Sequence, residues 1–115
     1  MTVQAGRAPQ ARDLRELLRL SRERMARLIG VSSKTIERWE VGASRPSRED
    51  ARRRLAQLSD VAALAEVVYG REGVAAFLGA PLAEHDGLSA LQLIERGEAD
   101  RVLASLASDY EGGGY

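Results

Sequence analysis

The chain contains no cysteine, a single histidine and few aromatic residues, and these shortages exclude several kinds of site. Without cysteine there is no disulfide framework, no thiolate metal site and no thiol nucleophile. His85 has only Glu84 and Asp86 as charged neighbours, and no second histidine completes a metal site or a nucleophile–base pair. We therefore expect a protein that is not an enzyme and has no catalytic residues, no metal site and no cofactor. Residues 84–86 are expected to form a solvated turn.

Long apolar runs are absent as well. No run approaches the roughly 20 residues that a membrane-spanning helix needs, and no basic-then-apolar leader opens the chain. No alternating strand pattern appears, whereas leucine, alanine and charged residues are abundant, which favours helices. The sequence predicts an all-α cytoplasmic protein with no membrane partner, and its 115 residues suit one domain or two small packed units.

The net charge of zero hides a strong division along the chain. Residues 1–56 carry 14 basic against 7 acidic side chains, a balance of +7, and residues 57–115 carry 3 against 10, a balance of −7. Such a division suggests two partners of opposite character. The basic half suits a polyanion. The acidic half would be repelled by DNA, so we expect it to face a protein.

The spacing of a helix-turn-helix runs through RERMARLIGVSSKTIERWEVGASRP, residues 22–46. The small Ala26 stands where two helices would cross at close range. Gly30 follows four residues later, where a sharp turn requires positive φ, which costs glycine nothing. The buried face of the second helix then carries Val31, Ile36 and Trp39. This pattern predicts a DNA-binding unit.

The start of the second helix of such a unit enters the major groove. There Lys34 or Arg38 would donate to guanine, and Thr35 would offer a hydroxyl group, or its methyl group to thymine. The free N–H groups around Ser32 suit a phosphate, and two flanking arginines are placed to clamp the DNA backbone. The predicted DNA-binding residues are Arg22, Ser32, Ser33, Lys34, Thr35, Arg38 and Arg45.

Three features of this half have more than one interpretation. Trp39 is either a base-stacking residue or, as its place in the pattern favours, part of the core. The run at residues 52–54 is a phosphate tract, a patch for a protein partner or a solvated helix face. Glu37 would repel DNA unless it pairs with Lys34, Arg38 or a cytosine amino group.

Apolar spacing and capping residues predict the remaining elements. Serines at helix starts are expected as N-caps, and glycine or proline ends most of the helices. The last five residues, EGGGY, are expected not to be helical because three consecutive glycines each cost about 1 kcal/mol. The expected N-caps are Ser21, Ser32, Ser47 and Ser89, and the expected helices span residues 10–20, 22–30, 32–40, 47–70, 72–78, 89–97 and 98–109.

The second half resembles the toxin-binding domain of the Xre/MbcA/ParS antitoxins. Its motifs are VVYG at 67–70, AAFLGAPL at 75–82 and GLSALQLIERGEADRVLASL at 87–106. Together with the helix-turn-helix, the likeness covers residues 10–115. The departures are changes of packing or turn residues: Phe77 replaces a usual tryptophan, Ala80-Pro81 an asparagine-containing turn and Ala90 a usual proline.

The resemblance implies a mechanism. Such antitoxins bind a partner toxin, usually a RES-domain protein that attacks NAD, and block it by presenting their C-terminal segment at its active-site mouth. The same complexes repress their own promoter through the helix-turn-helix. A glycine-rich acidic tail with a terminal aromatic also suits a cleft that binds an anionic dinucleotide, although a disordered end is the alternative. The expected toxin-binding residues are Tyr110, Glu111, Gly112, Gly113, Gly114 and Tyr115.

Four segments follow from these interpretations. Residues 1–9 form a flexible arm, whose Arg7 either touches DNA or belongs to a frayed terminus. Residues 10–46 are the Xre-like DNA-binding domain, 47–109 a helical toxin-binding and dimerisation domain, and 110–115 the tail. A homodimer is expected because one short recognition helix rarely gives enough specificity. The alternative functions are an Xre-type repressor without a toxin partner and an interaction module that no longer binds DNA.

Overall fold

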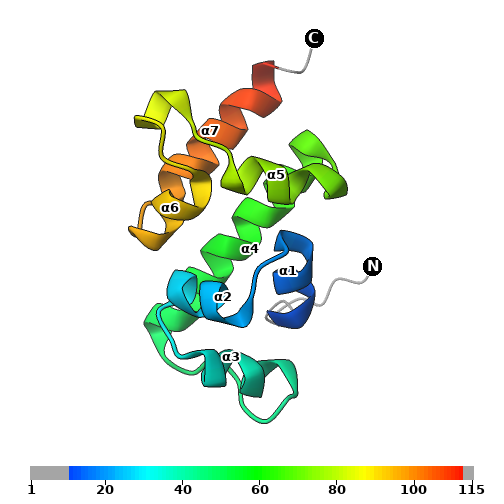
Figure 1. The fold of residues 1–115 in the computed structure, drawn as a ribbon, viewed down its shortest axis with the longest axis vertical. Coiled ribbons are helices and arrows are strands. Elements are labelled where there is room, and N and C mark those ends of the chain that lie inside the picture. Colours follow the sequence, from blue (N-terminus) through cyan, green and yellow to red (C-terminus); the bar gives the residue numbers. More distant parts are fainter. Residues whose placement is uncertain (1–10, 113–115) are drawn as a thin grey trace.

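The computed structural model describes residues 11–112, and over this range the protein is all-α, as predicted (Figure 1). No strand forms there, and a single isolated bridge joins Pro81 to Ser89. No helix of the described range is long and apolar enough to cross a membrane. The elements are α1 (Ala11–Leu18), α2 (Arg22–Ile29), α3 (Ser33–Glu40), α4 (Glu49–Tyr69), η1 (Arg71–Gly73), α5 (Val74–Gly79), η2 (Ala83–His85), α6 (Ala90–Glu95) and α7 (Ala99–Gly112).

Three serine caps define where the short helices begin. The side chains of Ser21, Ser32 and Ser89 accept hydrogen bonds from the backbone N–H three residues later, at the starts of α2, α3 and α6. Gln92 returns a bond to the Ser89 backbone N–H at 2.8 Å, which completes a capping box. These hydrogen bonds confirm the three predicted helix starts. Each cap contributes about 1 kcal/mol to the stability of its helix.

The predicted cap at Ser47 is wrong. Helix α4 begins at Glu49, and Arg48 occupies the cap position without a side-chain hydrogen bond. The first buried residue of α4 is Ala51, which is 5% exposed. Packing of that face on the core, together with the Glu49 and Asp50 carboxylates in the first turn, stabilises this start of the helix.

Three helix ends also differ from the prediction by more than one residue, and α6 stops at Glu95, two residues before its predicted end. Helix α1 stops at Leu18 because Arg19 adopts a left-handed conformation with φ of 56°. The Leu20 N–H then bonds the Arg15 carbonyl at 3.1 Å, a Schellman closure that needs no glycine here. Helix α7 continues to Gly112, three residues beyond its predicted end, so the expectation that EGGGY is not helical is wrong for Glu111 and Gly112.

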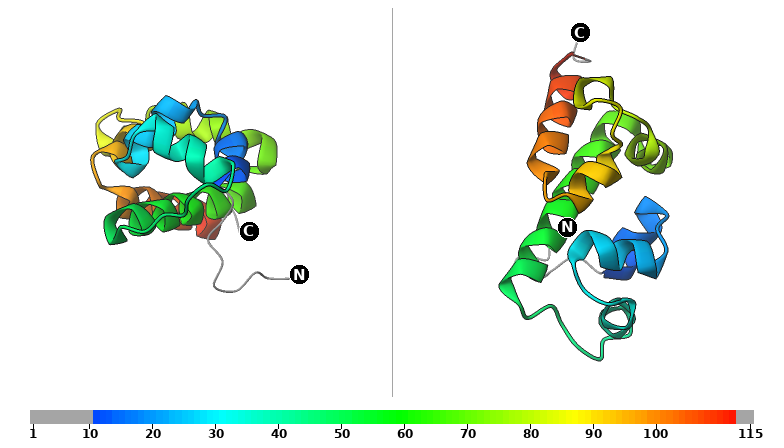
Figure 2. Two further views of the ribbon diagram at one scale, coloured as in Figure 1. Left: turned by 90° about the horizontal axis from the view of Figure 1, so that it is seen from below. Right: turned by 60° about the vertical axis from the view of Figure 1, so that its left-hand side comes forward.

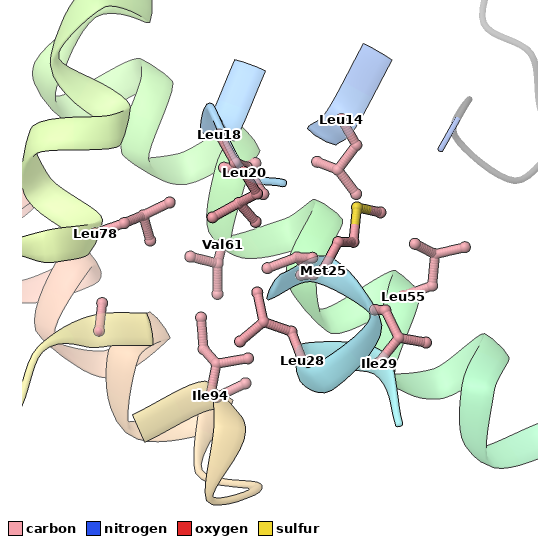
Figure 3. Close-up of a cluster of buried hydrophobic side chains, with 14 of the residues drawn as sticks. Leu14, Leu18, Leu20, Met25, Leu28, Ile29, Leu55, Val61, Leu78 and Ile94 are labelled. Atoms are coloured by element: carbon pink, nitrogen blue, oxygen red, sulfur yellow. The ribbon is translucent and has the colours of Figure 1, made fainter. Parts of the chain in front are cut away.

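One core is shared by both halves of the chain. Figure 3 shows leucine, isoleucine, valine and methionine side chains from α1, α2, α4, α5 and α6 turned toward one another. Met25, Leu28, Ile36 and Val61 are fully buried. The core is therefore continuous across residue 46, where the sequence suggested a boundary.

Helix α4 runs through the middle of the molecule, and α7 packs along it (Figure 1). The described chain measures 45 × 34 × 24 Å. Figures 1 and 2 show α3 at one end of the longest axis and the end of α7 at the other. The two regions for which the sequence predicted binding residues thus lie at opposite ends of the protein.

Candidate functional site

Helices α2 and α3 form the helix-turn-helix geometry that the spacing predicts. Gly30 ends α2 in the left-handed conformation with φ of 85°, and the Val31 N–H closes the turn on the Ala26 carbonyl at 3.0 Å. Ile36 is fully buried. Trp39 is half-buried and packs against the core, which is the structural role that its position favoured. The core thereby holds α3 in one orientation.

The opposite face of α3 carries the predicted base-reading side chains. Lys34 and Arg38 are exposed, while Ser33 and Thr35 are partly buried. The Ser32 hydroxyl accepts the Thr35 N–H at 3.1 Å and lies 3.0 Å from the Thr35 hydroxyl. These two hydroxyl groups hold the start of the helix, which leaves Lys34 and Arg38 as the long polar side chains that reach outward.

Glu37 lies on the same surface, and its charge is compensated within the helix. Its carboxylate pairs with the Lys34 ammonium at 3.5 Å, and both side chains are exposed. An exposed pair of this kind contributes at most about 1 kcal/mol, so Lys34 can leave Glu37 for a stronger anion. Arg38 forms no ion pair in the described range.

Arg22, one of the predicted phosphate clamps, belongs to a three-residue ion cluster. The Glu40 side chain is 2% exposed and accepts Arg15 Nε at 2.5 Å and Arg15 Nη2 at 3.1 Å. Arg22 Nε approaches the same carboxylate at 3.1 Å and keeps a 44% exposed side chain. The bidentate Arg15 bond and the Arg22 bond hold the pKa of Glu40 below its usual value, against the opposing effect of burial.

Sequence reasoning missed Glu40, although the sequence contains a signal for it. Glu40 lies four residues after the buried Ile36, so it shares the inner face of α3. A carboxylate on an inner face requires a cationic partner. Neither residue spacing nor charge identifies that partner as Arg15, because the two residues are 25 positions apart.

Ion pairs neutralise about half of the basic side chains in the basic half, and most of the unpaired ones lie near α3. Seven of its Lys and Arg side chains in the described range pair with carboxylates, including Arg24 and Arg27 of α2, which pair with Glu95 of α6 at 2.6 and 3.9 Å. The arginines of residues 11–56 without an ion pair there are Arg19, Arg38, Arg45, Arg48, Arg52 and Arg54. Five of these six lie on α3, the connector that follows it and the first turns of α4.

The end of α7 forms the second candidate surface. Tyr110 is 57% exposed, and Glu111 and Gly112 are exposed helical residues. Gly113, Gly114 and Tyr115, the other expected toxin-binding residues, lie outside the described residues, as does Arg7. The described part of this surface is therefore the last helical turn.

Tyr69 connects the end of α4 to α7. Its hydroxyl donates to the Asp109 carboxylate at 2.6 Å, and its ring stacks on Phe77 of α5 with centroids 5.0 Å apart. The hydrogen bond to Asp109, reinforced by burial, raises the pKa of Tyr69 to about 12. This contact fixes the last turns of α7 on the body of the protein.

His85 is more constrained than a solvated turn would be. It is half-buried at the end of η2, and its Nε2 lies 3.0 Å from the Ser105 hydroxyl of α7. That hydroxyl also donates to Glu84 at 3.2 Å. The backbone N–H of Glu84 and the Ser105 hydroxyl hold the pKa of Glu84 below its usual value. Residues 11–112 contain no group of three histidine or acidic side chains able to hold a metal ion.

Two comparisons with known proteins agree with this geometry. The helix-turn-helix family model matches residues 12–58, so the chain carries a helix-turn-helix domain of the Xre type that extends into α4. The chain is also similar to a chain in the crystal structure of the MbcT–MbcA toxin–antitoxin complex of M. tuberculosis. The TM-score is 0.76 at 26% identity, covering 94% of this chain and 96% of the other. No curated protein sequence matches significantly.

Proposed function

We propose that this chain, which has an N-terminal helix-turn-helix domain and the fold of a chain from a toxin–antitoxin complex, is the antitoxin of a toxin–antitoxin pair. One observation carries the proposal: the likeness spans both halves of the molecule, at 94% of this chain. A general repressor would share only the segment that matches the helix-turn-helix model, residues 12–58. The alternative function, an Xre-type repressor without a toxin partner, rests on that segment alone.

The DNA-binding part of the proposal uses α2 and α3. Lys34 and Arg38 read base edges, while Arg22 and Arg45 contact phosphates on either side. The Glu40 carboxylate pairs with the Nε of Arg22. The two outer nitrogens of the Arg22 guanidinium are then available to donate hydrogen bonds to a phosphate. A homodimer places two copies of α3 in successive major grooves about 34 Å apart, and the chain then represses its own promoter.

The toxin-binding part uses the end of α7 and the tail that follows it. Tyr110 and Glu111 are exposed on the last turn of α7, which Tyr69 and Asp109 hold in place. We propose that residues 110–115 enter the active-site mouth of a RES-domain toxin that degrades NAD, and so block it sterically. An acidic, glycine-rich segment suits a cleft that binds an anionic dinucleotide.

Co-expression with the neighbouring gene product tests the pairing. The neighbour alone should arrest growth and lower cellular NAD, and this chain should restore both and co-purify with it. Removal of residues 110–115 should abolish rescue while leaving the DNA gel shift intact. The matched control is Lys34→Ala with Arg38→Ala, which should abolish the shift and keep rescue.

The outcomes separate the two functions. A neighbour that is harmless and does not co-purify, combined with an intact gel shift, favours the repressor without a partner. Growth arrest without a fall in NAD keeps the antitoxin assignment and rejects the RES-type toxin. Loss of rescue in the DNA-binding variant would show that the two ends do not act separately.

A further inference from the structure

None of the residues proposed to bind DNA or a toxin line a basic pocket of about 310 Å³. It forms where the turn between α2 and α3 meets the first turns of α4 and the turn between α6 and α7. Both halves of the chain therefore contribute to its walls. The lining residues are Ile29, Gly30, Val31, Arg48, Asp50, Ala51, Arg53, Arg54, Gln57 and Gly97.

The charge of the pocket is positive and only partly compensated. Three arginines line it against the single carboxylate of Asp50, which pairs with Arg53 at 3.2 Å. Arg54 is half-buried, and within residues 11–112 it forms no ion pair and no hydrogen bond of its side chain. An anion in the pocket would supply this guanidinium with charge-assisted hydrogen bonds that no protein group in the described range provides.

Two glycines shape the space around Arg54. A Cβ atom built on Gly30 would lie 3.2 Å from Arg54 Nη1, and one on Gly97 would lie 3.8 Å from Nη2. Both glycines have positive φ, 85° and 82°, so their turns take this form without strain. The guanidinium of Arg54 thus lies between two tight turns, one from each half of the chain.

We propose that this pocket binds a small phosphate-bearing anion. The planar, always charged guanidinium matches the geometry of phosphate, and the lining carries three positive charges against one negative charge. The volume is at the lower end of the range for small-molecule sites, which suits a ligand the size of a nucleotide or smaller. The assignment is independent of the antitoxin function, because it uses neither α3 nor the end of α7.

The neighbouring charges favour a small anion over DNA. Gly97 is flanked by Arg96 and Glu98, with Glu95 beside them, and the half to which they belong carries a net charge of −7. A DNA backbone lying over the pocket would also meet the net negative charge of this half. A small anion needs only the arginines that line the pocket. Its occupancy would connect the DNA-binding half to the turn that starts α7.

Calorimetric titration of the full chain with inorganic pyrophosphate tests the site. We expect saturable binding that weakens as salt is added and falls at least about tenfold in Arg54→Gln, the loss of one charge-assisted hydrogen bond. Arg48→Gln, at an exposed position that a folded chain tolerates, should show a loss of similar size. Arg52→Gln is the matched control, because Arg52 lies on the same turn of α4 and does not line the pocket.

Three results would overturn the proposal. The first is the absence of saturable binding to the wild-type chain. The second is an equal loss in the Arg52 and Arg54 variants, which would indicate a diffuse attraction to the basic helix face. The third is unchanged pyrophosphate binding in Arg54→Gln together with weaker DNA binding, which would make Arg54 a contact for the DNA backbone.

Discussion

Replacement of Glu40 by glutamine should destabilise the fold more than any other single charge change on α3. The carboxylate is 2% exposed and accepts two bonds from Arg15, whose side chain is 18% exposed. Loss of one partner of a buried pair costs about 3–5 kcal/mol. Glutamine keeps the shape of the side chain and one acceptor oxygen, and loss of the bond to the half-exposed Arg22 adds little to the cost. We therefore expect the free energy of unfolding to fall by about 3 kcal/mol.

Thermal unfolding followed by circular dichroism measures this loss. At about 4–8 °C per kcal/mol for a domain of this size, Tm should fall by about 12–24 °C at pH 7. Glu37→Gln is the matched control on the same helix. Its pair with Lys34 is exposed on both sides and lies within one helix, where such pairs contribute at most about 0.5 kcal/mol, so Tm should change by less than about 4 °C.

The pH dependence gives a second readout. Because the folded pKa of Glu40 is lowered, its contribution is complete above the unfolded value of about 4.3 and is lost as pH falls through the folded value. The difference in Tm between wild type and Glu40→Gln should therefore shrink below pH 4. A variant within about 4 °C of wild type at pH 7, or a difference constant down to pH 3, would refute this account of the cluster.

Three further changes test the surfaces described above. Arg38→Ala should weaken operator binding about tenfold to a hundredfold and relax sequence preference in a gel shift, because a base contact is lost. Gly30→Ala should lower the free energy of unfolding by about 1–2 kcal/mol in urea titration, because φ is 85° and the new Cβ would lie 3.2 Å from Arg54. Tyr69→Phe should cost about 1 kcal/mol at pH 7, since its hydroxyl bonds the Asp109 carboxylate at an exposed site. In wild type one tyrosine should ionise only near pH 12, so the stabilisation should begin to fall above about pH 10 and be lost as the pH rises through about 12.

The sequence predicted the helix-turn-helix and the all-α fold because both depend on local signals. Gly30 and the capping serines act on their own turns, and the spacing of Ile36 and Trp39 defines one helix face. Such signals depend only on residues that are close in the sequence, so they can be recognised without knowledge of the tertiary structure. The missed features depend on residues that are distant in the chain.

The Arg15–Glu40 bond, the Tyr69–Asp109 bond and the position of Arg54 between two turns join segments that only the tertiary structure brings together. Charge counting identified a basic half but not which charges are neutralised within it. The wrong cap at Ser47 has the same origin, because packing of α4 outweighed a favourable local residue.

The distribution of unpaired charge makes the molecule an electrical dipole along its long axis. On residues 38–54, at the end that carries α3, five arginines and a single carboxylate, that of Glu49, have no ion pair in the described range. At the other end Glu84, Asp109 and Glu111 also lack ion pairs there. A DNA duplex attracts the first end and repels the second, so an approaching chain turns α3 toward the groove and the end of α7 outward. The toxin-binding surface proposed here would then remain open while the protein is on its operator, which is the geometry that a repressor bound to its toxin requires.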